Sequence, residues 1–346
     1  MKILVVKISA LGDVVHALPA ALYLRNRCPK AQIDWLVEEV FAPLLEGLPY
    51  IDTVLPLNSR EIREKKSCGE LKRMWQIVRR IRQTGYDYIF DLQGNTKSAF
   101  FTLISGAPRR FGFDRGGVRE WPNLLATNCK VPLDGAFHIA DRSLTVVAAA
   151  FPGGETPAFA ECLRPQPEAL AFVKKWLADH GTASRRIVVC HAGTTWKTKL
   201  WAPEHWQELL LRLRGERQTA IVLTWGNRQE RELAVSLREG SGDEVLLWPG
   251  GDLPKLAALL SLAALVVGGD TGPVHIAAAL GTPTVSIYRA TDADRNGPAG
   301  DQHVLLQCPL DCSPCLSKGC DRDRECSLAI PVSEVEKGVA KLLGSG

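Results

Sequence analysis

The residues with the clearest capacity for chemistry lie in the stretch 265–288, which reads LVVGGDTGPVHIAAALGTPTVSIY. Its apolar start predicts a buried parallel strand, and HIAAAL predicts a helix that ends at Gly281. Free backbone N–H groups and the positive end of a helix dipole favour a phosphate ligand at such a helix N-terminus. Asp270 and Thr271 occupy the N-cap region. Gly272 lets the backbone approach an anion, Thr271 offers a hydroxyl donor, and His275 lies one turn further on.

An ordinary strand–helix turn is the alternative interpretation of this stretch. In that case Asp270 and Thr271 only cap the helix, and His275 packs on the sheet. Capping residues are common in α/β proteins, so these residues alone leave both interpretations open.

Alternating strand and helix patterns run along the whole chain and predict doubly wound α/β architecture. The segment 151–167, FPGGETPAFAECLRPQP, is rich in Pro and Gly and predicts a linker. The alternation restarts after it, so we expect two Rossmann-like domains that face a central cleft. Their predicted bounds are 1–158 and 166–331, and the remaining residues 332–346 form a C-terminal helix.

Two helices of the first domain have informative patterns. A helix is predicted over 14–27, and Pro19 should kink it or separate a short first segment. A long basic helix is predicted over 61–84, with Trp75, Val78 and Ile81 among the residues directed toward the core.

Composition indicates an ordinary globular protein: 346 residues, 46% hydrophobic and 23% charged. We expect no signal peptide and no membrane-spanning segment, because no apolar run is long enough. The net charge of +4 is unevenly distributed, since residues 60–130 hold fifteen Lys and Arg against seven Asp and Glu. This excess favours an anionic partner, although a solvated helix face is the simpler explanation for 70–82 alone.

Several common signatures are missing from the sequence. It contains no GxGxxG, no GxxxxGK[ST] and no GxSxG, which argues against a classical dinucleotide dehydrogenase, a P-loop kinase and a serine hydrolase of the nucleophile-elbow type. We expect a phosphorylated small-molecule ligand and no nucleic acid.

Five of the ten cysteines lie within 308–326. The spacing of Cys312, Cys315, Cys320 and Cys326 is compatible with a structural zinc ion held by thiolates. Reduced thiols and a disulfide are the alternatives, and the sequence does not choose among them.

Several motifs resemble those of the lipopolysaccharide heptosyltransferases of glycosyltransferase family 9, and of heptosyltransferase I in particular. They are VKISALGDVVHALP from Val6, DWLVEE from Asp34, YDYIFDLQG from Tyr86, WAPEHW from Trp201, GDTGPVH from Gly269 and TD at Thr291. The cysteine-rich segment is more similar to heptosyltransferase II.

This resemblance implies a GT-B fold and a metal-independent, inverting transferase at the cytoplasmic face of the inner membrane. The donor would be ADP-L-glycero-β-D-manno-heptose, bound by the C-terminal domain. The acceptor would be the Kdo of the inner core on lipid A, bound by the N-terminal domain at an anionic membrane surface. The C-terminal helix would cross back to the N-terminal domain.

The resemblance also assigns roles to individual residues. Asp13 would be the general base, and its place near a helix N-terminus suits a charged carboxylate. The donor-binding residues would be Thr194, Thr195, Lys199, Glu230, Asp270, Thr271, Gly272 and His275. The loop before Trp201 is one residue longer than the family pattern, so Lys197 is an alternative to Lys199. The acceptor-binding arginines would be Arg60, Arg63, Arg119 and Arg142, whose planar guanidinium groups suit carboxylates and phosphates.

Rival functions stay open at this point. The chain could be heptosyltransferase II, another sugar-nucleotide transferase or an epimerase on the same scaffold. A non-catalytic protein that binds nucleotide sugars or the lipid core belongs to a different class, and it would not require Asp13.

Overall fold

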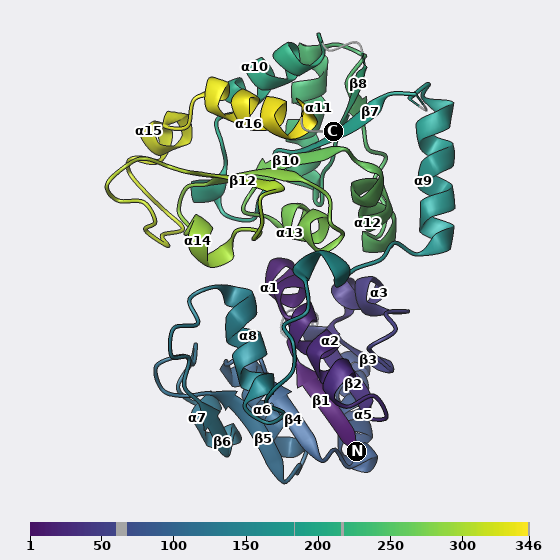
Figure 1. The fold of residues 1–346 in the computed structure, drawn as a ribbon, viewed down its shortest axis with the longest axis vertical. Coiled ribbons are helices and arrows are strands. Elements are labelled where there is room, and N and C mark those ends of the chain that lie inside the picture. The colour runs from purple at the N-terminus through teal and green to yellow at the C-terminus, as the bar shows by residue number, and fades with distance from the viewer. Residues whose placement is uncertain (60–67, 183, 216–217, 345–346) are drawn as a thin grey trace. The chain divides into compact units, whose positions relative to one another are not determined.

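A computed structural model describes residues 1–59, 68–182, 184–215 and 218–344. Two of the expected acceptor arginines, Arg60 and Arg63, lie outside the described residues. The chain divides into two compact units, Met1–Ala158 and Phe159–Gly346, each with its own sheet and core (Figure 1).

The first unit begins with β1 and ends its regular structure with α8. Its elements are β1 (Lys2–Val6), α1 (Leu11–His16), α2 (Leu18–Arg27), β2 (Gln32–Glu38), η1 (Glu39–Phe41), α3 (Ala42–Leu45), β3 (Thr53–Leu57), α5 (Cys68–Thr84), β4 (Tyr88–Asp91), α6 (Thr96–Ile104), β5 (Arg109–Phe113), α7 (Asn123–Ala126), β6 (Cys129–Val131) and α8 (Ile139–Ala148).

The second unit runs from a short 3-10 helix to the C-terminal helix. Its elements are η2 (Phe159–Glu161), α9 (Pro167–Asp179), β7 (Arg186–His191), η3 (Lys197–Lys199), α10 (Pro203–Leu213), β8 (Thr219–Leu223), α11 (Arg228–Ser241), β9 (Leu246–Leu247), α12 (Leu253–Leu262), β10 (Leu265–Gly269), α13 (Gly272–Ala279), β11 (Thr284–Tyr288), α14 (Ala293–Asn296), β12 (His303–Gln307), α15 (Asp323–Leu328) and α16 (Val332–Gly344).

Both sheets are parallel and have the same topology. The order is β3-β2-β1-β4-β5-β6 in the first unit and β12-β11-β10-β7-β8-β9 in the second. When the six strands of each unit are numbered from one to six along the chain, both sheets have the order 3-2-1-4-5-6, which is the doubly wound order. The order reverses between β1 and β4, and between β7 and β10. Ligands of such sheets bind beyond the carboxyl ends of the strands at this point.

The central strands β1, β7 and β10 are mostly apolar and buried, because helices cover both faces of each sheet. In the first unit, residues of β1, β2 and β3 form a core with Val78 and Ile81 of α5. In the second, β7, β10 and β11 share a core with α10 and α11. These buried strands give the loops at their carboxyl ends a fixed platform.

Two helix predictions for the first unit have different outcomes. The prediction for Pro19 is confirmed, because α1 ends at His16 and α2 starts at Leu18 with Pro19 in its first turn, where no amide hydrogen is needed. The prediction for Trp75 is wrong, since its side chain is 57% exposed although Val78 and Ile81 are buried. Trp75 lies on the solvent side of α5.

The C-terminal helix α16 is part of the second unit. Val332, Val335 and Val339 are buried in its core, and Gly338 lets the helix approach Val304 and Val285. A return of this helix to the first unit stays a prediction. None of the helices in the described ranges combines the length and apolarity needed to cross a bilayer.

Candidate functional site

The start of α13 in the second unit has chemical features that suit an anion. Thr271 is the N-cap residue with an extended backbone (φ −141°), but its side chain makes no capping hydrogen bond. Its hydroxyl oxygen is buried and has no hydrogen-bond partner within the described ranges. The first N–H groups of an α-helix have no acceptor inside the helix. The buried Thr271 hydroxyl group and the N–H groups of the first helical turn, other than Pro273 which has none, therefore lie together where β10 ends.

Asp270 lies just before this helix start and joins two other predicted site residues. Its Oδ2 accepts a hydrogen bond from Lys199 Nζ at 2.6 Å, and its Oδ1 lies 2.9 Å from His275 Nε2. The side chains of all three residues are largely buried, at 15% exposure or less. The ordinary-turn interpretation does not describe this arrangement, because Asp270 does not cap the helix and His275 turns toward the carboxylate.

The charge state of Asp270 follows from competing effects. Burial raises the pKa of this carboxyl group, but the hydrogen bonds and charges of His275 and Lys199 outweigh burial and lower the pKa below its usual value. Asp270 is therefore a carboxylate at neutral pH. It holds one N–H donor of the Lys199 ammonium group, which has three, so donors remain for a phosphate.

Glu230 lies at the start of α11 and approaches the end of β7. Its carboxylate accepts hydrogen bonds from Gly226 N and Asn227 Nδ2, both at 2.7 Å. A Cβ atom on Gly193 would lie 2.3 Å from Glu230 Cγ, so only glycine permits this approach. The Glu230 side chain is only 10% exposed, which differs from a solvated helix glutamate.

His191, at the end of β7, lies behind Glu230. Its Nε2 is 3.7 Å from Glu230 Oε2, and its Nδ1 is 3.0 Å from Thr224 Oγ1. Burial lowers the pKa of His191 more than Glu230 and Thr224 raise it, so the imidazole is neutral at pH 7. Sequence reasoning did not select this residue, although it directly precedes the AGTT segment of the candidate donor loop.

The loop after β7 also carries Thr194, Thr195 and Lys197. Thr194 is half-buried, while Thr195 and Lys197 are exposed. The ammonium group of Lys199 lies 4.8 Å from the ring centre of Trp196. Lys199, and not Lys197, is the lysine whose ammonium group contacts Asp270.

In the first unit, Asp13 is the third residue of α1, directly after the β1 loop. It is half-buried, and Ala10 N lies 3.4 Å from its Oδ2. Gln93 fixes this loop, because its Oε1 accepts hydrogen bonds from Ile8 N and Ser9 N, both at 2.9 Å. Gln93 belongs to the loop after β4, so the two loops at the strand-order reversal are joined.

Cations lie close to this loop. Lys7 is buried and donates to Leu92 O at 2.8 Å. Burial lowers the pKa of Lys7, and the charges that act on it include Asp13, Arg119 and Arg142. Arg142 Nη2 donates a hydrogen bond to Gly117 O at 2.8 Å, and the Arg119 side chain is exposed. Asp13, Arg119 and Arg142 thus all act electrostatically on Lys7, and a shared acceptor site for these residues stays a prediction.

The cysteine-rich segment had three alternatives from the sequence: a zinc ion, reduced thiols or a disulfide. No group of three or more His, Cys, Asp or Glu residues in the described part of the chain is arranged to hold a metal ion. Cys312, Cys315 and Cys320 are exposed, whereas Cys326 contacts Cys308, with 3.5 Å between the sulfur atoms.

Comparisons with known proteins identify the family. The model of glycosyltransferase family 9 (heptosyltransferase) matches residues 74–324. Lipopolysaccharide heptosyltransferase 1 of Pseudomonas aeruginosa is 34% identical over 333 residues, covering 92% of this chain and 87% of that protein. The protein of the same name from Escherichia coli K12 is 30% identical over 314 residues, covering 89% and 94%.

Solved structures agree with this assignment. The E. coli heptosyltransferase WaaC with ADP has a TM-score of 0.79 and 27% identity, covering 99% of this chain and 100% of that chain. E. coli heptosyltransferase II has a TM-score of 0.77 at 21% identity, which supports the fold alone. The GT-B class of fold and the resemblance expected from the sequence motifs are confirmed. This chain belongs to glycosyltransferase family 9, the heptosyltransferase family.

Proposed function

We propose that this protein is a heptosyltransferase of type I, which moves L-glycero-D-manno-heptose from ADP-heptose to the Kdo of the lipopolysaccharide inner core. The observation that carries the proposal is the Lys199–Asp270–His275 group at the start of α13, in a chain 34% identical to a heptosyltransferase 1. WaaC, a structural relative of this chain, was solved with ADP and with ADP-2-deoxy-2-fluoro heptose.

The second unit holds the donor in this proposal. The Lys199 ammonium group and the amides at the start of α13 bind the diphosphate, and the Thr271 hydroxyl donates to it. Glu230 accepts hydrogen bonds from the ribose hydroxyls. Thr194, Thr195, Gly272 and His275 line the same site. All of them lie in the loops after β7 and β10 or at the starts of α11, which follows β8, and α13, which follows β10.

The first unit holds the acceptor. Arg119 and Arg142 bind the carboxylates of Kdo. Arg60 and Arg63 are expected from the sequence to assist, and they lie outside the described residues. Asp13 takes the proton of the attacking hydroxyl group. The acceptor oxygen then forms its bond to the anomeric carbon as the bond from that carbon to the ADP oxygen breaks, so the anomeric centre is inverted.

The negative charge that develops on ADP is stabilised by Lys199 and the helix N-terminus, so the chemistry as proposed requires no metal ion. The acceptor is a lipid, and we propose that the protein works at an anionic inner-membrane surface on the cytoplasmic side. The basic helix α5 supports this location.

Mass spectrometry of reaction products tests the proposal. Incubation with ADP-heptose and heptose-free Kdo–lipid A should add one heptose to the acceptor. Heptosyltransferase II would instead require an acceptor that already carries one heptose. A protein that binds ADP-heptose but transfers nothing to either acceptor would belong to the non-catalytic alternative, and turnover of UDP-sugars would indicate another transferase.

A further inference from the structure

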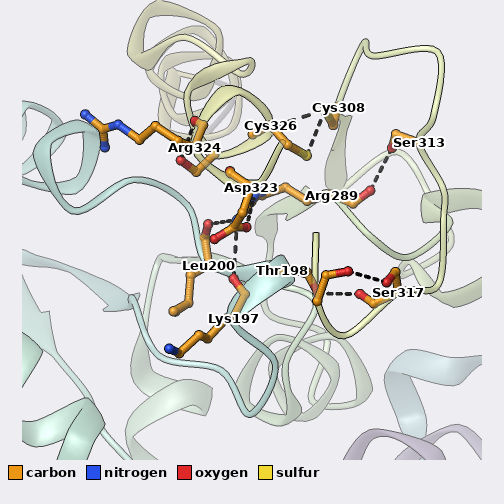
Figure 2. A network of polar contacts seen from close by, with 12 residues as sticks. Lys197, Thr198, Leu200, Arg289, Cys308, Ser313, Ser317, Asp323, Arg324 and Cys326 are labelled. Carbon is orange, nitrogen blue, oxygen red and sulfur yellow. Dashed lines mark hydrogen bonds and ion pairs between the residues drawn. The ribbon is translucent and has the colours of Figure 1, made fainter. Parts of the chain in front are cut away.

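Arg289, the residue after β11, is a buried cation with an unusual set of partners. Its side chain is 1% exposed. Nη1 donates to Leu200 O and, at 3.4 Å, to Lys197 O. Nη2 donates to both the backbone oxygen and Oδ1 of Asp323 at 2.7 Å. A buried guanidinium group without such acceptors would be strongly unfavourable, so these contacts fix the positions of three separate chain segments (Figure 2).

Two of the carbonyl groups that Arg289 binds flank Lys199. Lys197–Lys199 is the 3-10 turn η3, which Leu200 N closes with a hydrogen bond to Lys197 O at 2.9 Å. Arg289 therefore contacts the turn through its backbone and leaves the Lys199 side chain free to contact Asp270.

The loop 308–322, between β12 and α15, holds the same turn from another direction. Thr198 Oγ1 donates to Ser317 O at 2.6 Å, and the Thr198 side chain is buried. Ser313 Oγ donates to Arg289 O at 2.7 Å, which ties this loop to the arginine itself. Figure 2 shows Thr198 beside Ser317 and, separately, Ser313 beside Arg289.

We propose that Arg289 is a positioning residue for the donor site: it holds the Lys197–Leu200 turn so that the Lys199 ammonium group stays against Asp270, ready for the diphosphate. The inference rests on the proposed function, because it assigns Lys199 to the donor diphosphate. It goes beyond the donor-binding residues, because it gives a role to Arg289, which acts through Lys199, and to the cysteine-rich loop 308–322 that contacts Arg289.

A double-mutant cycle with ADP as the probe tests this role. Arg289→Lys keeps the charge but loses the planar fork that reaches carbonyls on two sides. We expect ADP to bind about tenfold more weakly to this variant by calorimetry, since small displacements of a binding group are costly. In a Lys199→Ala background the same substitution should change ADP affinity little, because its effect acts through Lys199.

Arg324→Gln is the matched control. Arg324 lies on α15, next to Asp323, and the change breaks its ion pair with Glu204 of α10 but removes no contact to the turn. ADP affinity should stay at the wild-type value in this variant. If Arg289→Lys does not fold, Asp323→Asn replaces it in the cycle, since Asp323 is 43% exposed and its loss leaves the carbonyl contacts in place. The loss of ADP affinity in Asp323→Asn should be smaller than in Arg289→Lys, and it should likewise disappear in the Lys199→Ala background.

The outcomes separate the two proposals. The positioning role would be overturned if the folded Arg289 or Asp323 variant bound ADP with wild-type affinity. It would also be overturned if the variant lost the same ADP affinity with and without Lys199. The proposed function would stand in both cases. A wild-type protein that neither binds ADP nor transfers heptose would overturn the proposed function itself.

Discussion

The Lys199 ammonium group donates to the Asp270 carboxylate at 2.6 Å, across 71 positions of sequence. This contact joins the loop after β7 to the start of α13, the two elements that flank the strand-order reversal of the second sheet. Because His275 occupies the other oxygen of Asp270, the carboxylate orients a cation and an imidazole at one helix N-terminus. Asp270 thus organises the proposed diphosphate site without itself binding an anion.

The first prediction separates the two lysines of this loop. Lys199→Ala should lower kcat for heptose transfer by about 10²–10³-fold, since it removes a charge that stabilises the leaving group. Lys197→Ala is the control, because the Lys197 side chain is exposed, and it should leave kcat unchanged. Steady-state kinetics with ADP-heptose measures both. A larger loss in Lys197→Ala would assign the diphosphate contact to Lys197.

The second prediction concerns the base. Asp13→Ala should keep wild-type affinity for ADP, because Asp13 belongs to the first unit and the donor residues to the second. Transfer should fall by about 10²-fold or more, as expected for loss of a general base. Calorimetry with ADP and a single-turnover transfer assay provide the two measurements. Turnover close to wild type would show that another group accepts the proton.

The fold was predictable from local patterns. The apolar run that ends at Gly268 located β10, and Pro19 located the break between α1 and α2, because each depends on a few neighbouring residues. The contacts of Gln93 and Arg289 were not predictable in this way. Gln93 meets Ile8 and Ser9 from 84 or 85 positions away, and such pairings exist only once the sheet order is known.

Trp75 illustrates a second limit of sequence reasoning. A tryptophan near the apolar positions of a helix is usually placed in the core, because indole burial is favourable. In α5, however, Trp75 shares the solvent-facing stripe of Lys72, Arg79 and Arg82, all exposed, at spacings of three and four residues. Sequence periodicity did not separate it from the adjacent buried positions.

The third prediction follows from this stripe. Basic residues near an anionic bilayer add about 1 kcal/mol each, and tryptophan favours the membrane interface. The protein should therefore bind vesicles with anionic lipids in a salt-sensitive way, and Arg79→Gln with Arg82→Gln should weaken binding roughly 30-fold. Lys174→Gln with Lys175→Gln on α9 is the control, an exposed pair in the second unit. Equal sedimentation with neutral vesicles would exclude this surface role.

The fourth prediction concerns acid stability. Burial lowers the pKa of His303 to about 4 from 6.5, so below pH 6.5 the unfolded chain binds a proton that the folded chain does not. The free energy of unfolding should therefore decrease as the pH falls from 6.5 toward 4. His303→Asn should reduce this decrease, and the exposed His180→Asn should not. Urea titrations at pH 7, 5.5 and 4.5 measure the difference, and parallel curves for wild type and His303→Asn would contradict it.

The fifth prediction distinguishes the observed cysteine arrangement from a zinc site. Cys312, Cys315 and Cys320 are exposed, while Cys308 is buried beside Cys326, and burial together with the Cys308 contact raises the pKa of the Cys326 thiol. Because the thiolate is the reactive form, iodoacetamide should label the three exposed cysteines quickly in the native protein and Cys308 and Cys326 slowly, as read by peptide mass spectrometry. A chelator should not change this pattern.

Thiolates that hold zinc would be protected as a group of four, Cys326 included, and would all become reactive when the chelator removes the metal. Joint protection of Cys312, Cys315 and Cys320 that a chelator relieves would therefore restore the metal site that their spacing first suggested.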